Sequence, residues 1–167
     1  MSVRLLLCIF LVGAFGASGV ASARDAPPQP SSSAKPQPPQ LTPQQIAAIR
    51  KQNQVLVNYA GAIANMVDHG QVAQVWDASS EVAKKAVPKD KFVKATEADR
   101  AQLGTVTSRK VQEITRGVSD GSKLPQGYYV NINFATQFSK YAKPVRELVS
   151  FHLDKDRTWR LSGYTVH

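Results

Sequence analysis

The sequence predicts an α+β domain in which three N-terminal helices, one of them long, pack on an antiparallel sheet of three or four strands. Two observations carry this prediction. Apolar residues recur at spacings of three and four in the first half of the chain, and they alternate with polar residues in the second half. Helices and strands are therefore segregated along the chain, which argues against a parallel, doubly wound sheet.

Residues 1–23 have the pattern of a secretory signal peptide. Arg4 supplies a positive start, residues 5–15 form an apolar core, and Ala21-Ser22-Ala23 is a small-residue cleavage site. Cleavage near Ala23 would deliver the protein to the periplasm or the cell exterior. The single cysteine, Cys8, would leave with this segment, so the mature chain would be stabilised without disulfides.

Residues 24–43 are rich in Pro, Gln and Ser and contain almost no large apolar residue. This composition predicts a flexible linker. The remaining residues, 44–167, are long enough for one hydrophobic core and too short for two, so they are expected to form a single α+β domain.

A long amphipathic helix is expected to begin at Thr42-Pro43, because Thr suits the N-cap and Pro the first helical position. The apolar stripe continues from Ile46 to Val67, which carries the helix to about Asp68. Gly70 then ends it, since glycine readily adopts the left-handed conformation found after helices.

Two further helices are expected to follow, one around Val72–Trp76 and one from about Lys89 to Leu103. The second half of the chain predicts strands at 128–138, 145–154 and 159–166, with a polar turn at 154–157 joining the last two. A weaker strand is expected at 105–116, because its alternation is irregular.

A series of short motifs lies along these elements. In chain order they are Asp68-x-Gly70, Val75-Trp76, Arg100-x-x-Leu103-Gly104, Ser108-Arg109, Leu124-Pro125, the 129–138 strand, Arg146-Glu147-x-Val149 and Trp159-Arg160-x-x-Gly163-Tyr164. In the order and spacing of these motifs the chain resembles, over residues 54–166, the bacterial domain of unknown function numbered 4019, found in exported proteins. The resemblance implies an envelope location and a small fold similar to the cystatin-like or nuclear-transport-factor-2-like cone, and it implies no activity.

The chain is basic, with a formal net charge of +9, and its most concentrated charge is a run of lysines. Such a run is typical of a solvated helix face. It could also attract an acidic protein partner, because complementary charge raises association rates. The candidate partner-binding residues are Lys84, Lys85, Lys89, Lys91 and Lys94, extended by Lys140, Lys143 and Arg146 if the fold brings them near.

A cone-shaped fold can also enclose a pocket, for which the candidate residues are Trp76, Asp77, His152 and Tyr164. An acid–base enzyme would use His152 or Asp77. Each has a structural alternative: Trp76 in the core, Asp77 on the outer face of its helix, and His152 as an exposed strand residue.

No nucleophile elbow, phosphate-binding loop, dinucleotide fingerprint or metal-ligand spacing occurs in the sequence. No catalytic residue, metal or cofactor is therefore predicted. The leading hypothesis is an exported, non-enzymatic binding protein whose partner is another envelope protein with an acidic surface, for example as an immunity- or inhibitor-type protein.

Two alternatives stay open beside that hypothesis. One is the small-molecule pocket or acid–base enzyme. The other is a structural homodimer joined through the heptad stripe of Ile46, Asn53, Ala60 and Val67, or through an open sheet face carrying Asn133. Nucleic acid is not expected as a partner of an exported protein, and contact with a membrane surface has no supporting pattern.

Overall fold

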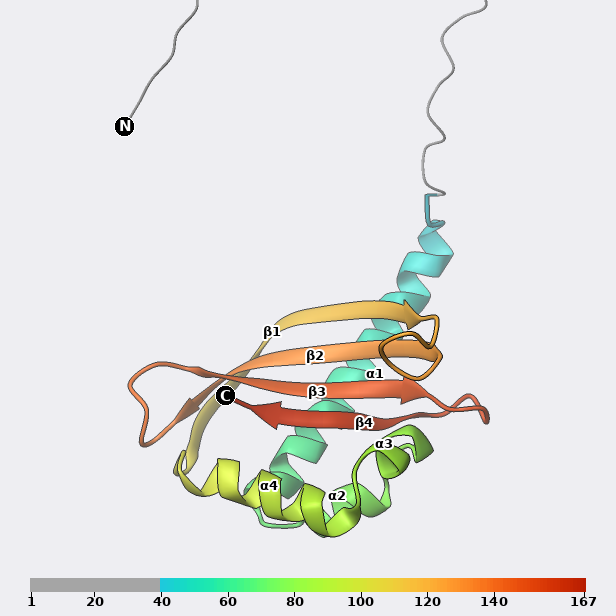
Figure 1. Cartoon of the computed structure of the whole chain (residues 1–167). Helices are drawn as coiled ribbons and strands as arrows, with labels where there is room; N and C mark the ends of the chain where they lie inside the picture. Colours follow the sequence, from blue (N-terminus) through green and yellow to red (C-terminus); the bar gives the residue numbers. More distant parts are fainter. Residues whose placement is uncertain (1–39) are drawn as a thin grey trace, which may run out of the picture. The chain divides into compact units, whose positions relative to one another are not determined.

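The computed structural model describes residues 40–167, so the predicted signal peptide and residues 24–39 of the predicted linker lie outside the described residues. Within 40–167, helices precede a four-stranded antiparallel sheet, which confirms the predicted α+β class (Figure 1). No helix of this part of the chain has the length and apolar character needed to cross a membrane. The elements are α1 (Pro43–Asp68), α2 (Val72–Asp77), α3 (Glu81–Ala86), α4 (Lys89–Ala101), β1 (Val106–Ser119), β2 (Gly127–Phe138), β3 (Val145–Leu153) and β4 (Trp159–Val166).

Helix α1 begins and ends where the sequence predicts. Thr42 caps it in a reciprocal arrangement, in which Thr42 Oγ1 accepts from Gln45 N at 3.2 Å and Gln45 Oε1 accepts from Thr42 N at 2.8 Å. Gly70 takes a positive φ of 72° just after the helix. The buried residues of α1 begin only at Leu56, and the N-terminal turns of this helix extend past β1 (Figure 1).

The sequence predicted three helices, and the described chain has a fourth, α3. This helix has only six residues and none of them is buried, so it lacks the apolar periodicity that reveals a longer helix. The sequence feature that could have indicated α3 is Ser80, whose side chain caps the first turn by accepting from Val82 N at 3.2 Å.

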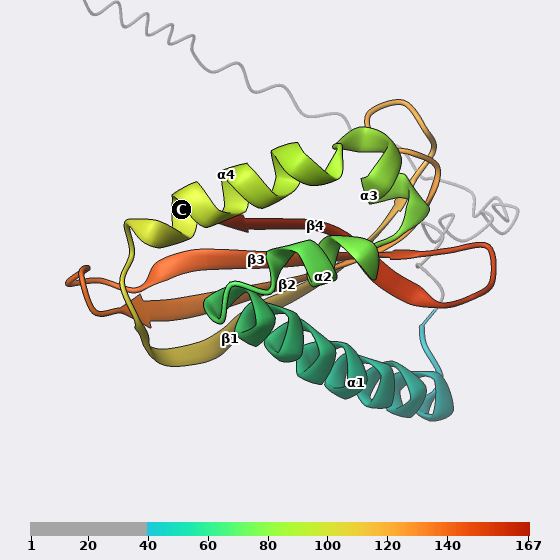
Figure 2. The same cartoon turned by 90° about the horizontal axis from the view of Figure 1, so that it is seen from below.

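The sheet is a simple meander in the order β1-β2-β3-β4. Helices α3 and α4 contact β4, and Ser80 N donates to Leu161 O at 2.8 Å, so the short helices close that edge (Figure 2). Helix α1 instead contacts β1 and β2 as it crosses the sheet. Strand β1 is the opposite edge and has no strand beyond it among residues 40–167.

The core lies between α1, α2 and the sheet face that carries Ile132 and Phe151, both fully buried. The other face is less open than its polar residues predicted. Asn133 is buried because its amide donates to Glu113 Oε2 at 3.2 Å and accepts from Arg146 Nε at 2.9 Å. Polar side chains on this face therefore cover one another across the strands.

Candidate functional site

The core contains a carboxylate, Glu147, whose side chain is 0 % exposed. Glu147 Oε2 accepts from Arg109 Nε at 2.6 Å and from Thr136 Oγ1 at 2.6 Å. Glu147 Oε1 accepts from Tyr164 O–H at 2.7 Å and from Arg109 Nη2 at 3.2 Å. These bonds compensate the buried charge, as a buried carboxylate requires.

The same network reaches the end of α1 through Asp68. Asp68 accepts from Arg109 Nη2 at 2.9 Å and from Arg100 Nη2 at 2.7 Å, so two guanidinium groups alternate with two carboxylates. The Arg100 guanidinium also lies 4.5 Å from the centre of the Phe138 ring. The network thereby fastens α1 and α4 to all four strands of the sheet.

The network explains two pKa shifts. Burial would lower the pKa of Arg109, but its bonds to Glu147 and Asp68 outweigh burial and raise it. Burial and the neighbouring negative charge of Glu147 raise the pKa of Tyr164 well above its ordinary value. Tyr164 therefore stays a neutral donor inside the core. This core network is where the structure places the pocket candidate Tyr164.

His152 is the candidate base of the pocket hypothesis, and its expected exposure is wrong: the residue is 7 % exposed. Its Nδ1 lies 2.8 Å from Asp154 Oδ1, which also accepts from Ser80 Oγ at 2.6 Å. Its Nε2 is buried without a hydrogen-bond partner in the described chain and faces Gly127, where an added Cβ would lie 2.3 Å away. This nitrogen is therefore enclosed, although His152 lines a surface groove of about 720 Å³ that Asp77 also lines.

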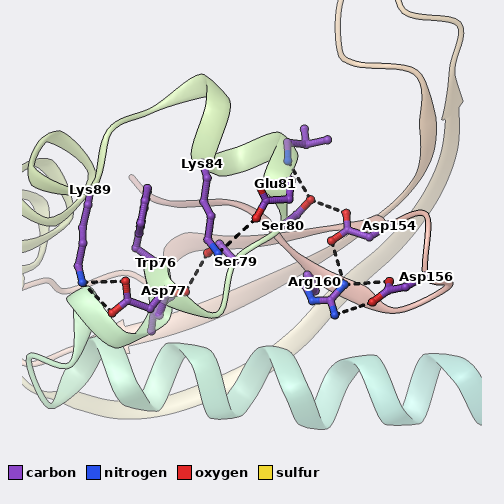
Figure 3. Close-up of polar contacts among 12 residues, drawn as sticks. Trp76, Asp77, Ser79, Ser80, Glu81, Lys84, Lys89, Asp154, Asp156 and Arg160 are labelled. Carbon is purple, nitrogen blue, oxygen red and sulfur yellow. Dashed lines mark hydrogen bonds and ion pairs between the residues drawn. The ribbon is translucent and has the colours of Figure 1, made fainter.

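Asp154 is the centre of that cluster and joins the β3–β4 turn to α3. Arg160 Nη1 donates to its second oxygen at 3.1 Å (Figure 3). Burial would raise the pKa of Asp154, but the hydrogen bonds from Ser80, His152 and Arg160 outweigh burial and lower it. Asp154, Ser80, His152 and Arg160 form a cluster, which we call the clamp, that fastens the β3–β4 turn to the start of α3.

The predicted lysine run divides into paired and unpaired members. Lys84 Nζ lies 3.6 Å from Glu81, and Lys89 Nζ lies 2.7 Å from Asp77 (Figure 3). Both lysines also sit over the Trp76 ring, at 5.7 and 5.9 Å from its centre. Trp76 is half-buried rather than in the core, and its Nε1 donates to a backbone carbonyl.

Lys85, Lys91 and Lys94 are exposed, and none has a carboxylate within 4.0 Å among residues 40–167. The expected extension of this patch is only partly realised. Lys140 lies at the far end of α4, where its Nζ donates to Ala101 O at 3.4 Å. Lys143 is exposed in the β2–β3 loop, and Arg146 lies on the sheet face away from the core.

An open apolar feature lies at one end of the sheet, near the N-terminal half of α1. Val118 of β1 pairs with Tyr128 of β2, and Leu153 of β3 pairs with Trp159 of β4. Each lies an even number of residues from a core residue on its strand and so projects to the core side of the sheet. Val118 is 73 % exposed and Tyr128 58 %.

These four side chains form a row across the sheet, which we call the sheet-end row. It lines an open groove of about 490 Å³. Helix α1 lines this groove with Gln52, one turn before its first buried residue, Leu56. The other groove-lining residues are Arg116, Gly117, Tyr129 and Arg157.

Residues 59–164 match a protein family described as a protein of unknown function (DUF4019). The chain belongs to the DUF4019 family. No curated protein matches the chain. The match confirms the predicted family and spans α2, α3, α4 and all four strands, including the sheet-end row.

The motifs by which the chain resembles DUF4019 meet in the buried network. Asp68, Arg100, Arg109, Glu147 and Tyr164 come from five separate motifs, and the fold places them in one continuous set of hydrogen bonds. Within this chain those motifs therefore build the core rather than a surface site.

Sequence reasoning missed the groove. The 128–138 strand was predicted, but nothing in the sequence showed where α1 departs from the sheet. The sequence could have drawn attention to Arg157, because a hairpin turn of this length favours Gly or Asn at the position that Arg157 occupies. No cluster of His, Cys, Asp and Glu suited to a metal ion occurs in the described part of the chain.

Proposed function

We propose that this DUF4019 chain is an exported binding protein that acts without catalysis and holds a small ligand in the sheet-end groove. The observation that carries the proposal is the row of apolar side chains, one from each strand, that lines an open groove and is most exposed at Val118 and Tyr128. A concave site lined by apolar and aromatic side chains with a few polar groups is the usual form of a small-molecule site.

The titratable groups of the core support binding rather than catalysis. Glu147 and Asp68 each accept from guanidinium groups, and Asp154 accepts from three side chains. The unpartnered nitrogen of His152 is enclosed. A general acid or base must come within hydrogen-bond reach of its substrate, and none of these residues lines the sheet-end groove.

Export is supported by the charge, apolar core and small-residue cleavage site of residues 1–23. A periplasmic or secreted location fits a protein that captures a ligand outside the cytoplasm.

The test is binding of the neutral fluorophore N-phenyl-1-naphthylamine to the mature chain. The paired substitutions Val118→Ser and Tyr128→Ser remove apolar surface that is already exposed, so the fold is expected to tolerate them. Tyr141→Ser is the matched control, because Tyr141 is also an exposed aromatic residue but does not line the groove. We expect saturable binding that the paired variant loses and the control keeps. Equal binding by all three proteins would refute the proposal.

A second candidate function rests on the surface around Trp76. This half-buried tryptophan, bracketed by Lys84 and Lys89, lies beside Val87, which is exposed. An aromatic residue flanked by cations is a common anchor in protein interfaces, so this surface is suited to an acidic protein partner.

Affinity capture from envelope extract at low salt tests that candidate. One bait carries Lys85, Lys91 and Lys94 changed to Glu, and the control bait carries the same change at the exposed residues Lys51, Lys110 and Lys123. A partner that is lost only with the first bait supports the candidate. Capture that is equal with both baits contradicts it.

A further inference from the structure

We propose that the ligand of the sheet-end groove is an amphipathic anion, with an apolar or aromatic body on the row and an acidic group bound by Arg157. This inference rests on the proposed function, because it specifies what the groove binds. Three features of the groove carry it: the absence of acidic residues from its lining, the state of Arg116, and the backbone position of Arg157.

The charged residues that line the groove are all positive. Its lining holds two guanidinium groups, from Arg116 and Arg157, and no Asp or Glu. The groove beside His152 differs, since its lining combines lysines and an arginine with Asp77, Glu81, Asp154 and Asp156. A cationic site next to apolar walls attracts an anion and strengthens its binding, because the walls exclude water.

Arg116 is held in place by neutral partners only. Its Nη1 donates to Gln52 Oε1 at 2.7 Å, and its Nε donates to Asn53 Oδ1 at 3.2 Å. These bonds leave its positive charge uncompensated, as no carboxylate lies within 4.0 Å among residues 40–167. Burial lowers the pKa of Arg116, which agrees with the absence of a neighbouring anion.

Arg157 stands in a conformation that a long side chain rarely adopts. Its φ is 62°, and it is the only non-glycine residue of the described chain with a positive φ. The turn closes through Arg157 N to Asp154 O at 2.9 Å and Asp154 N to Thr158 O at 3.0 Å. Gly or Asn would relieve this strain, and such strain is concentrated at functional sites.

The Arg157 guanidinium is also free. The acidic residues of its own turn, Asp154 and Asp156, both bind Arg160 instead, with Nη1 and Nη2 of Arg160 at 3.1 and 2.7 Å from them (Figure 3). No side-chain hydrogen bond of Arg157 occurs within residues 40–167. Its planar fork of donors can therefore bind a carboxylate, sulfonate or phosphate through two parallel bonds.

The size of the groove limits the body of the ligand. A groove of about 490 Å³ is within the range of small-molecule sites. The row runs from β1 to β4, a distance of about 14 Å at the usual strand spacing, and Arg157 lies in the turn at its β3–β4 end. A ligand with a few rings or a medium alkyl chain spans the row and brings a terminal acidic group to Arg157.

The test compares two fluorophores that share one ring system. 8-Anilino-1-naphthalenesulfonate carries a sulfonate, and N-phenyl-1-naphthylamine lacks it. Each is titrated against the mature chain, the Arg157→Asn variant and the Lys155→Asn variant. Arg157→Asn removes the guanidinium and suits the positive φ, so its thermal stability should equal or exceed that of the parent. Lys155→Asn removes the same charge from the same turn outside this groove.

We expect one sulfonate dye to bind per chain, about tenfold more tightly than the neutral dye, which corresponds to one charge-assisted bond. Arg157→Asn should reduce the affinity for the sulfonate dye about tenfold and leave the neutral dye unchanged, whereas Lys155→Asn should change neither by more than about twofold. Equal affinities for the two dyes, or equal losses in the two variants, would overturn this inference and leave the proposed function standing. Failure of both dyes to bind would overturn both.

Discussion

Replacing Glu147 by Gln tests whether the buried network holds the domain together. The carboxylate accepts four hydrogen bonds, two on each oxygen, from Arg109, Thr136 and Tyr164. A glutamine retains one accepting oxygen and places an N–H₂ group where the other stood. The Tyr164 hydroxyl can rotate to accept from that group, but the Arg109 guanidinium cannot.

The loss of stability in the Glu147→Gln variant can be derived from these hydrogen bonds. One charge-assisted bond is worth about 1.5–3 kcal/mol, and Arg109 also loses half of its compensating charge in a buried setting. We therefore expect the free energy of unfolding of Glu147→Gln to fall by about 3 kcal/mol, or the melting temperature by about 10 °C for a domain of this size.

Thr136→Val provides the matched comparison, because it keeps the shape of a fully buried side chain and removes one neutral donor. Its cost should be about 1.5 kcal/mol, the lower end for a hydrogen bond to a charged group. Urea unfolding of both variants and of the double variant at neutral pH measures the costs and their coupling. A Glu147→Gln cost no larger than that of Thr136→Val would refute the structural role of the network.

Three further outcomes are expected. Because the pKa of Tyr164 is raised, the folded state loses stability as pH rises above about 10, where unfolded tyrosine ionises, and Tyr164→Phe should flatten this alkaline limb in thermal unfolding across pH. Because the pKa of Asp154 is lowered, its contribution is present above the unfolded value of 3.8 and is lost as pH falls below it. The Asp154→Asn variant should be less stable than the parent at neutral pH and should lose less stability as the pH falls. An unchanged loss of stability at acid pH would contradict the stabilising role of Asp154 in the clamp. Cleavage after Ala23 predicts that intact-mass analysis of protein from the envelope finds a chain beginning at Arg24, and an uncleaved chain would contradict export.

Elements whose signals are local were predictable from the sequence. The long helix was found because Thr42 and Gly70 mark its ends and its apolar stripe has the helical period. Helix α3 was missed because it buries no residue and so leaves no period to read.

The sites were harder to predict because they depend on distances between elements. His152 was expected to be exposed, since its position in β3 points away from the core. Its contacts with Tyr129 and Gly127 come from β2, a separate segment of the chain. The sheet-end row depends on where α1 leaves the sheet. Periodicity shows which face of a strand is apolar, but it does not show how far a helix covers that face.

Native mass spectrometry of the full-length protein, recovered from the envelope of its host under mild conditions, tests the central claim most directly. The account predicts the mature chain with a bound small molecule that is lost in the Val118→Ser, Tyr128→Ser variant and kept in the Tyr141→Ser control. Recovery of the bare chain, or of a complex with another protein and no small molecule, would contradict the account.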